Sequence, residues 1–155
     1  MPIDEGKAAP AFTLIDQDGN KVALKDFKGK NVIIYFYPKD DTPGCTKEAC
    51  GFRDYWDEIN KSGTIILGVS PDEGESHQKF IKKYDLPFTL LSDPKRSMMD
   101  RYDAYGEKNM YGKITMGVIR STVLIGKDGK VIKHWKRVAK AADHPQKVLQ
   151  TLNSI

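Results

Sequence analysis

A chain of 155 residues is long enough for one folded domain with its own core, and a composition that is 39% hydrophobic and 30% charged is typical of a globular protein. The net charge of +4 comes from interleaved acids and bases, which excludes the basic block of a nucleic-acid-binding surface, and no apolar run reaches the roughly 18 residues that a membrane span needs. The N-terminal segment carries acids early and lacks the apolar core of a signal peptide, so we expect the protein in the cytoplasm. Together these features predict a single domain over residues 1–155 with no nucleic-acid or membrane partner.

The first part of the chain predicts short strands followed by a helix. Residues 11–15 and 21–24 are expected strands on either side of an Asp-Gly-Asn turn. A continuous run of apolar, β-branched and aromatic residues over 31–37 predicts a strand buried on both faces. After a polar loop, apolar side chains at spacings of three and four predict a helix over about residues 45–60.

The remainder of the chain continues this alternation and closes with a hairpin and a helix. The hairpin is indicated by the turn sequence GKDG between two apolar runs. The expected elements are strands at residues 64–70 and 88–93, helices near residues 73–84 and 95–102, hairpin strands at residues 117–125 and 130–138, and a last helix after the His-Pro pair at residues 144–145.

This order of elements predicts an α/β fold with a central mixed sheet flanked by helices on both faces. It is the order of the thioredoxin-like fold, although periodicity by itself fits other α/β folds as well.

Both cysteines lie in the stretch YPKDDTPGCTKEACGFRD, residues 37–54. Cys45 falls at the first turn of the expected helix, directly after a buried strand, which is where open α/β sheets place their sites. Unpaired backbone N–H groups and the positive end of the helix dipole favour a thiolate there, and the thiolate is the nucleophilic form of cysteine. A cysteine that is simply a small buried apolar residue is an alternative for Cys50, but the polar turn DTPGCT argues against it for Cys45.

Two other kinds of thiol chemistry fit the sequence less well. The spacing C-x-x-x-x-C differs from the C-x-x-C of thioredoxin-type oxidoreductases. His77, His134 and His144 are scattered along the chain, so no set of ligands for structural zinc is formed. His77 lies on a helix that looks exposed, and we interpret it as a surface or structural residue.

The segment YPKDDTPGCT contains P-x-x-x-T-x-x-C, which resembles the active-site motif of the peroxiredoxins. The continuation CTKEACGFRD, with a second cysteine five residues on, resembles the bacterioferritin comigratory protein, or peroxiredoxin Q, subfamily. The similarity covers nearly the whole chain and includes GKAAPAFTLIDQDG, GVSPD, FTLLSD and RSTVLIGKDGKV. It implies a thioredoxin-like fold and a thiol-dependent peroxidase that uses no metal, haem or flavin.

The resemblance also implies a role for each residue of the motif. Cys45 would be the peroxidatic cysteine, Cys50 the resolving cysteine, Thr42 a hydrogen-bond partner of the peroxide, Arg120 the stabiliser of negative charge, and Pro38 a shield over the sulfur. Glu48, one turn after Cys45, either orients Arg120 or serves as a first-turn acid that favours the helix dipole. Taken alone, Arg120 is equally a solvent-facing strand residue, and Thr42 and Pro38 are ordinary turn residues.

The implied substrates are hydrogen peroxide and organic hydroperoxides. The implied cycle passes through a Cys45–Cys50 disulfide that thioredoxin or a similar dithiol protein reduces, and the implied oligomeric state is a monomer. The alternative is a redox-sensing or chaperone-like thiol switch module, which would form the same disulfide but turn over poorly.

Helix geometry separates the two sulfurs. Residues five apart on an ideal helix are separated by about 7.5 Å of rise and have Cα atoms roughly 8.6 Å apart. A disulfide tolerates at most about 7 Å between Cα atoms. We therefore expect the first turns of this helix to unwind before Cys50 can reach Cys45.

Overall fold

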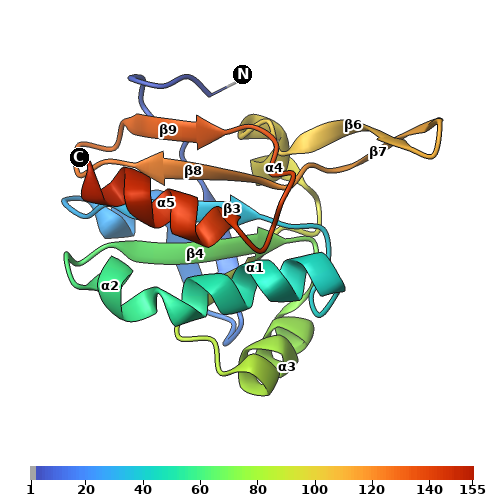
Figure 1. Cartoon of the computed structure of the whole chain (residues 1–155), viewed down its shortest axis with the longest axis horizontal. Helices are drawn as coiled ribbons and strands as arrows, with labels where there is room; N and C mark the ends of the chain where they lie inside the picture. Colours follow the sequence, from blue (N-terminus) through green and yellow to red (C-terminus); the bar gives the residue numbers. More distant parts are fainter. Residues whose placement is uncertain (1–2) are drawn as a thin grey trace.

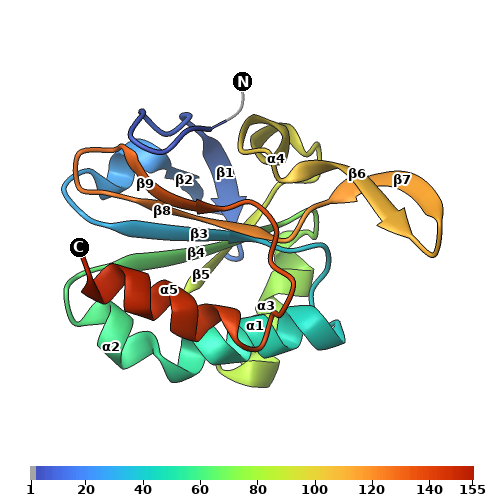
Figure 2. The ribbon, with the colours of Figure 1, turned by 45° about the horizontal axis from the view of Figure 1, so that its top comes forward.

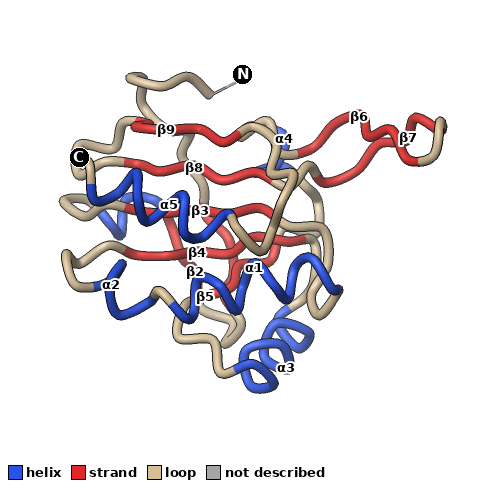
Figure 3. The backbone as a smooth tube through the Cα atoms, in the orientation of Figure 1, coloured by secondary structure: helices blue, strands red, loops and turns tan. Residues whose placement is uncertain are grey.

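The computed structural model describes residues 3–155, with every side chain in that range except that of Met110. Nine strands are present in this range: β1 Thr13–Asp16, β2 Lys21–Ala23, β3 Val32–Phe36, β4 Ile65–Ser70, β5 Thr89–Ser92, β6 Tyr105–Met110, β7 Lys113–Val118, β8 Ser121–Ile125 and β9 Val131–Trp135. Seven of them form one sheet in the order β2-β1-β5-β4-β3-β8-β9, and β6 and β7 form a separate hairpin that projects from the body of the molecule (Figures 1 and 3).

The sheet is mixed, because β3, β4 and β5 run parallel, while β8 pairs antiparallel with β3 and β9 pairs antiparallel with β8. The helices are η1 Leu24–Phe27, α1 Pro43–Asp54, α2 Trp56–Asn60, α3 Gly74–Tyr84, α4 Ser97–Arg101 and α5 His144–Asn153. Helices α1, α2, α3 and α5 cover one face of the sheet, and α4 lies on the other (Figure 2). The expected central mixed sheet flanked by helices is confirmed. Within residues 3–155, no helix combines the length and the apolar character needed to cross a bilayer.

Strand β3 supplies side chains to both cores, as its continuous apolar sequence predicts. Its odd-numbered residues, with Tyr37 beyond them, pack among Phe52, Phe80 and Val148 beneath the larger helical layer. Its even-numbered residues pack on the opposite face, in the cluster that contains Met98. All five residues of β3 are buried, so the strand is a rigid base for the loop that follows it.

The helix expected over residues 45–60 differs from the observed one at its start and in its middle. It begins at Pro43, since proline is pre-organised for the first helical position. It is interrupted at Tyr55, where φ is −98° and ψ is 6°, so that α1 and α2 are separate helices. The interruption directs Trp56 against Phe88, with ring centroids 6.3 Å apart, while Ile59 stays in the core.

The strand expected over residues 117–125 is also two strands, and Arg120 lies between them, not inside one. The chain leaves the projecting β6–β7 hairpin at Val118 and enters the main sheet at Ser121. The hairpin itself was not predicted. Its turn places both Tyr111 and Gly112 at positive φ, and tyrosine at the first position departs from the Asn-Gly signal of such turns.

Candidate active site

The pairing of β3 with β8 brings Arg120 to the N-terminus of α1. Phe36, the last residue of β3, is the register partner of Ser121, the first residue of β8. Arg120 therefore lies at the same end of the sheet as the loop that leads from β3 into α1. Its carbonyl oxygen accepts a hydrogen bond from the amide of Val138 at 2.9 Å, which ties its backbone to the segment after β9.

Cys45 is the third residue of α1, and its side chain is fully buried. The Arg120 guanidinium donates a hydrogen bond from Nη2 to the Cys45 Sγ at 3.2 Å, across 75 residues of sequence. Behind the sulfur, Cys45 belongs to the apolar cluster that contains Tyr35 and Ala49. The thiol thus has a cation on one side, an apolar wall on the other and the unpaired N–H groups of the first helical turn beside it.

Gly44 makes this approach of Arg120 possible. A Cβ atom at position 44 would lie 3.0 Å from Arg120 Nη2, closer than side chains normally pack. Sequence reasoning missed this role. The available signal was a glycine, a poor helix former, inside the first turn of a helix.

Glu48 is the third member of a chain of contacts that runs from Cys45 through Arg120. Its Oε1 accepts a hydrogen bond from Arg120 Nη1 at 2.8 Å, and its side chain is fully buried. Its Oε2 has no hydrogen-bond partner among the described residues. Burial raises the pKa of Glu48 from 4.5 to about 7, although Arg120 opposes the shift. The structure therefore supports the orienting role for Glu48 and places one cation between two acidic groups.

Arg120 remains charged in this setting. Burial alone would lower the pKa of its guanidinium, but Glu48 and Cys45 together outweigh burial and the pKa is raised. Its two terminal nitrogens serve different partners, Nη1 the carboxylate of Glu48 and Nη2 the sulfur of Cys45.

The raised pKa of Glu48 predicts a specific dependence of stability on pH. Between about pH 4.5 and pH 7 the unfolded chain loses the Glu48 proton while the folded protein keeps it, so the free energy of unfolding falls as pH rises through this window. Above pH 7 the loss is complete and is on the order of 3 kcal/mol. Glu48→Gln should remove this component, which denaturant unfolding at a series of pH values will measure.

Both proteins in that comparison should carry Cys45→Ser, which removes the neighbouring thiol from the titration. The difference between the two stability curves then reports Glu48 alone. Curves that stay parallel from pH 4.5 to pH 7 would show that Glu48 is ionised throughout.

The other predicted site residues lie around this centre. Pro38, Arg120, Ile119 and Val138 are among the residues that line an open pocket of about 250 Å³. The Thr42 hydroxyl donates to the Lys39 carbonyl oxygen at 2.9 Å, so its oxygen is available as an acceptor.

Cys50 lies further along α1, partly buried, and both cysteines are free thiols. Burial is the main cause that raises the pKa of Cys50; Asp54 adds to it, and Arg53 opposes it.

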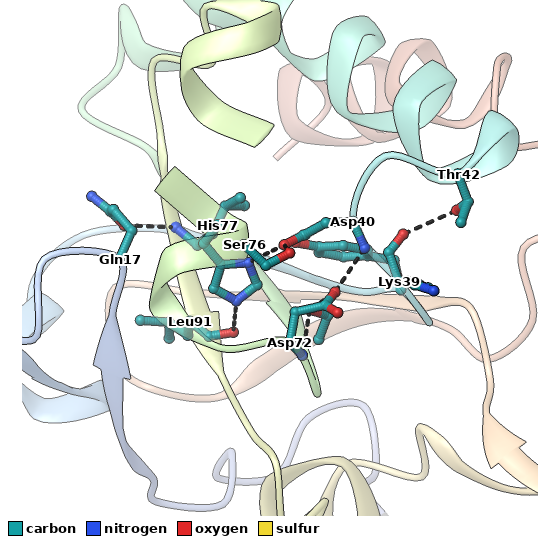
Figure 4. Close-up of polar contacts among 11 residues, drawn as sticks. Gln17, Lys39, Asp40, Thr42, Asp72, Ser76, His77 and Leu91 are labelled. Carbon is teal, nitrogen blue, oxygen red and sulfur yellow. Dashed lines mark hydrogen bonds and ion pairs between the residues drawn. The ribbon is translucent and has the colours of Figure 1, made fainter. Parts of the chain in front are cut away.

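A second polar cluster lies beneath the loop between β3 and α1 (Figure 4). Asp40, Asp72 and His77 have ligand-type atoms within 4.8 Å of one another, an arrangement that could hold a metal ion. Each group also hydrogen-bonds outside the cluster, Asp40 to Ser76, Asp72 to Ser70 and His77 to the carbonyl of Leu91, so the cluster is satisfied without a metal. His77 is fully buried, which corrects the surface interpretation of this residue and leaves the structural one.

Comparison with known proteins agrees with this geometry. The sequence profile of the AhpC/TSA family matches residues 6–134. The chain belongs to this family. It is 46% identical to Peroxiredoxin Bcp of Bacillus subtilis over 155 residues, covering 100% of this chain and 98% of the relative. It is 45% identical to Peroxiredoxin Bcp of Escherichia coli over 151 residues, covering 97% and 96% of the two chains.

Solved structures lead to the same subfamily. The Xanthomonas campestris bacterioferritin comigratory protein, studied for its alkyl peroxide reduction activity, superposes with a TM-score of 0.89 at 39% identity, covering 97% of this chain and 98% of that one. The expected membership of the bacterioferritin comigratory protein/peroxiredoxin Q subfamily and the thioredoxin-like fold are confirmed. The protein is thus a peroxiredoxin, a thiol peroxidase of the oxidoreductase class.

Proposed function

We propose that Cys45 is the peroxidatic cysteine and Cys50 the resolving cysteine of this peroxiredoxin. The observation that carries the proposal is the 3.2 Å contact between Arg120 Nη2 and Cys45 Sγ at the N-terminus of α1. In the first step the Cys45 thiolate attacks one peroxide oxygen, the O–O bond breaks and Cys45 becomes a sulfenic acid. The leaving oxygen takes up a proton and departs as water or an alcohol.

The residues around the sulfur stabilise the charge that moves in this step. Negative charge shifts from the sulfur to the leaving oxygen, and the Arg120 guanidinium beside the sulfur is a preorganised donor for both. The Thr42 hydroxyl oxygen accepts a hydrogen bond from the peroxide O–H and so orients it. Pro38 shields the site from bulk water. The proposed substrates are hydrogen peroxide and organic hydroperoxides.

In the second step Cys50 gives up its proton, its thiolate attacks the Cys45 sulfenic acid, a sulfur–sulfur bond forms, and the S–O bond breaks so that the hydroxyl takes up a proton and leaves as water. In the folded helix, burial raises the pKa of Cys50 and so lowers the fraction of its reactive thiolate. Unwinding of α1 removes this burial and brings the two sulfurs within reach. Unwinding of α1 therefore both favours the Cys50 thiolate and brings it to Cys45.

Gly51 allows α1 to pack closely against α5. A Cβ atom at position 51 would lie 2.7 Å from Cγ of Pro145, so α1 and α5 are in close contact there. Unwinding breaks this contact, and glycine, as a weak helix former, lowers the cost of leaving the helical state.

On oxidation to the Cys45–Cys50 disulfide, the backbone amides of residues 46–56 are expected to lose the protection from hydrogen exchange that the helix gives them. In the reduced protein the amide of Thr46 donates to the carbonyl of Thr42 at 2.8 Å, the first bond of this helix. Hydrogen exchange read by mass spectrometry on reduced and disulfide forms measures the change, with α5 as the internal reference. Cys50→Ser should keep the helix after peroxide treatment and overoxidise to sulfinic acid more readily. Full protection of α1 in protein that demonstrably holds the disulfide would contradict this step.

We further propose that thioredoxin or a similar dithiol protein reduces the disulfide and that the protein acts as a cytoplasmic monomer formed by a single domain. The test is NADPH oxidation coupled through thioredoxin reductase and thioredoxin, with hydrogen peroxide and an organic hydroperoxide as substrates. Sustained NADPH oxidation supports the enzyme. Formation of the disulfide with little turnover would favour the thiol switch.

A further inference from the structure

The loop between β3 and α1 is held by a buried carboxylate. Asp40 is 7% exposed and lies between Pro38 and Thr42 in sequence. Its Oδ1 accepts a hydrogen bond from the Tyr37 hydroxyl at 2.5 Å. Its Oδ2 accepts from Ser76 Oγ at 2.7 Å and contacts His77 Nδ1 at 2.7 Å, so one carboxylate joins the loop to α3 (Figure 4).

His77 connects Asp40 to the sheet. Its second ring nitrogen, Nε2, lies 3.0 Å from the carbonyl oxygen of Leu91 in β5, and a carbonyl can only accept, so Nε2 carries a hydrogen. The contact between Nδ1 and Asp40 then holds one further proton, shared by the two side chains. The pair has no net charge, which is compatible with its burial.

The backbone of the loop is anchored independently of these side chains. The Asp40 amide donates to Asp72 Oδ2 at 2.7 Å, and the same oxygen accepts from Ser70 Oγ at 2.9 Å. These partners lie at the end of β4 and just after it. Among the described residues, the side-chain partners of Asp40 are Tyr37 just after β3, Asp72 between β4 and α3, and Ser76 and His77 on α3, and none lies on α1.

Resting on the function proposed above, we propose that Asp40 and His77 are positioning residues that hold the Pro38–Thr42 loop in its reactive shape whether α1 is folded or unwound. The loop carries two of the proposed peroxide-site residues, and α1 carries both cysteines. Because the partners of Asp40 avoid α1, unwinding that begins by breaking the Thr46–Thr42 bond leaves these anchors of the loop in place. Refolding of α1 after reduction then returns Cys45 to a preformed pocket.

Amide exchange in the native sequence tests the first part of this inference. In NMR exchange measurements the Asp40 amide, bonded to Asp72, should stay protected in both the reduced and the disulfide form. The Thr46 amide should lose its protection on oxidation. Loss of protection at both amides together would show that the loop unwinds with α1 and would overturn the proposal.

Variants of Asp40 test its positioning role by comparing the rates of the two chemical steps. Asp40→Ala should slow formation of the sulfenic acid about tenfold, by analogy with the removal of a group that orients a reacting site. It should leave the conversion of sulfenic acid to disulfide within about twofold, because that step takes place with α1 unwound. Rapid-quench mass spectrometry follows both steps in a single turnover.

A conservative variant and a matched control distinguish positioning from general destabilisation. Asp40→Asn should recover most of the lost rate, since its amide can donate to a neutral His77 and its oxygen can accept from Tyr37. Asp93 is equally buried, at 1% exposed, and accepts a hydrogen bond from the Met99 amide on the opposite face of the sheet. Asp93→Ala should lower stability but leave sulfenic acid formation unchanged.

The outcomes keep this inference separate from the function on which it rests. A native protein that does not form a sulfenic acid with hydrogen peroxide would refute the proposed roles of the cysteines. A native protein that reacts, together with a folded Asp40→Ala variant that reacts equally fast, would refute only the positioning role. If Asp40→Ala does not fold, the exchange measurement on the native protein still decides.

Discussion

Replacing Cys45 with serine is expected to reduce peroxide turnover to background. The serine hydroxyl occupies the same buried position beside Arg120, but it does not ionise at neutral pH and so supplies no nucleophile. The coupled NADPH assay measures the loss, and mass spectrometry of the protein after one equivalent of peroxide shows whether a sulfenic acid has formed.

Cys50→Ser is the matched control, because it removes the other thiol of the same helix. With one equivalent of peroxide it should form the sulfenic acid and no disulfide, since no second sulfur is present, and only excess peroxide should carry it on to sulfinic acid. Substantial turnover by the Cys45→Ser protein would assign the reaction to another group and would remove the central assumption about this site.

Substituting Arg120 with lysine is expected to slow sulfenic acid formation at least about tenfold, which corresponds to about 1.4 kcal/mol of transition-state stabilisation. Arginine uses one nitrogen for Glu48 and another for Cys45, at 2.8 Å and 3.2 Å. Lysine keeps the charge but has a single nitrogen, which cannot reach both partners in the same geometry. Stopped-flow measurements over a range of peroxide concentrations give the second-order rate constant.

The control for the Arg120→Lys substitution is Arg101→Lys, at an exposed arginine of α4 on the other face of the sheet. Its rate constant should match that of the native protein. If Arg120→Lys also matches it, the two-nitrogen contact is not used in the reaction, and Arg120 has only a structural role.

Local sequence patterns predicted the elements that surround Cys45. The buried strand at β3 could be identified because five consecutive apolar residues leave no solvent-facing side. The position of Cys45 at a helix N-terminus followed from the turn residues before it and the helical spacing after it. These signals come from residues close together in sequence, so they can be interpreted without knowledge of the rest of the fold.

The polar partners of the site were harder to predict, because they come from distant segments. Arg120 was placed beside Cys45 by resemblance to a family, whereas its sequence context suggested a residue inside a strand. The structure shows why it reaches Cys45: the antiparallel pairing of β8 with β3 brings position 120 to the end of β3. Pairing of strands far apart in sequence is set by the whole sheet and leaves no local signal at Arg120.

The Asp40–His77 anchor could not be predicted at all. In sequence, Asp40 is one of several polar residues in a turn, and His77 follows other polar residues on a helix whose apolar side is narrow. Only the packing of α3 against the sheet buries both side chains and brings them within 2.7 Å. By itself, then, the sequence determined where the Cys45 sulfur lies and what kind of element carries it. The tertiary structure decided which charges surround that sulfur and what holds its loop, because burial and pairing across 37 and 75 residues depend on the assembled sheet and not on neighbours in the chain.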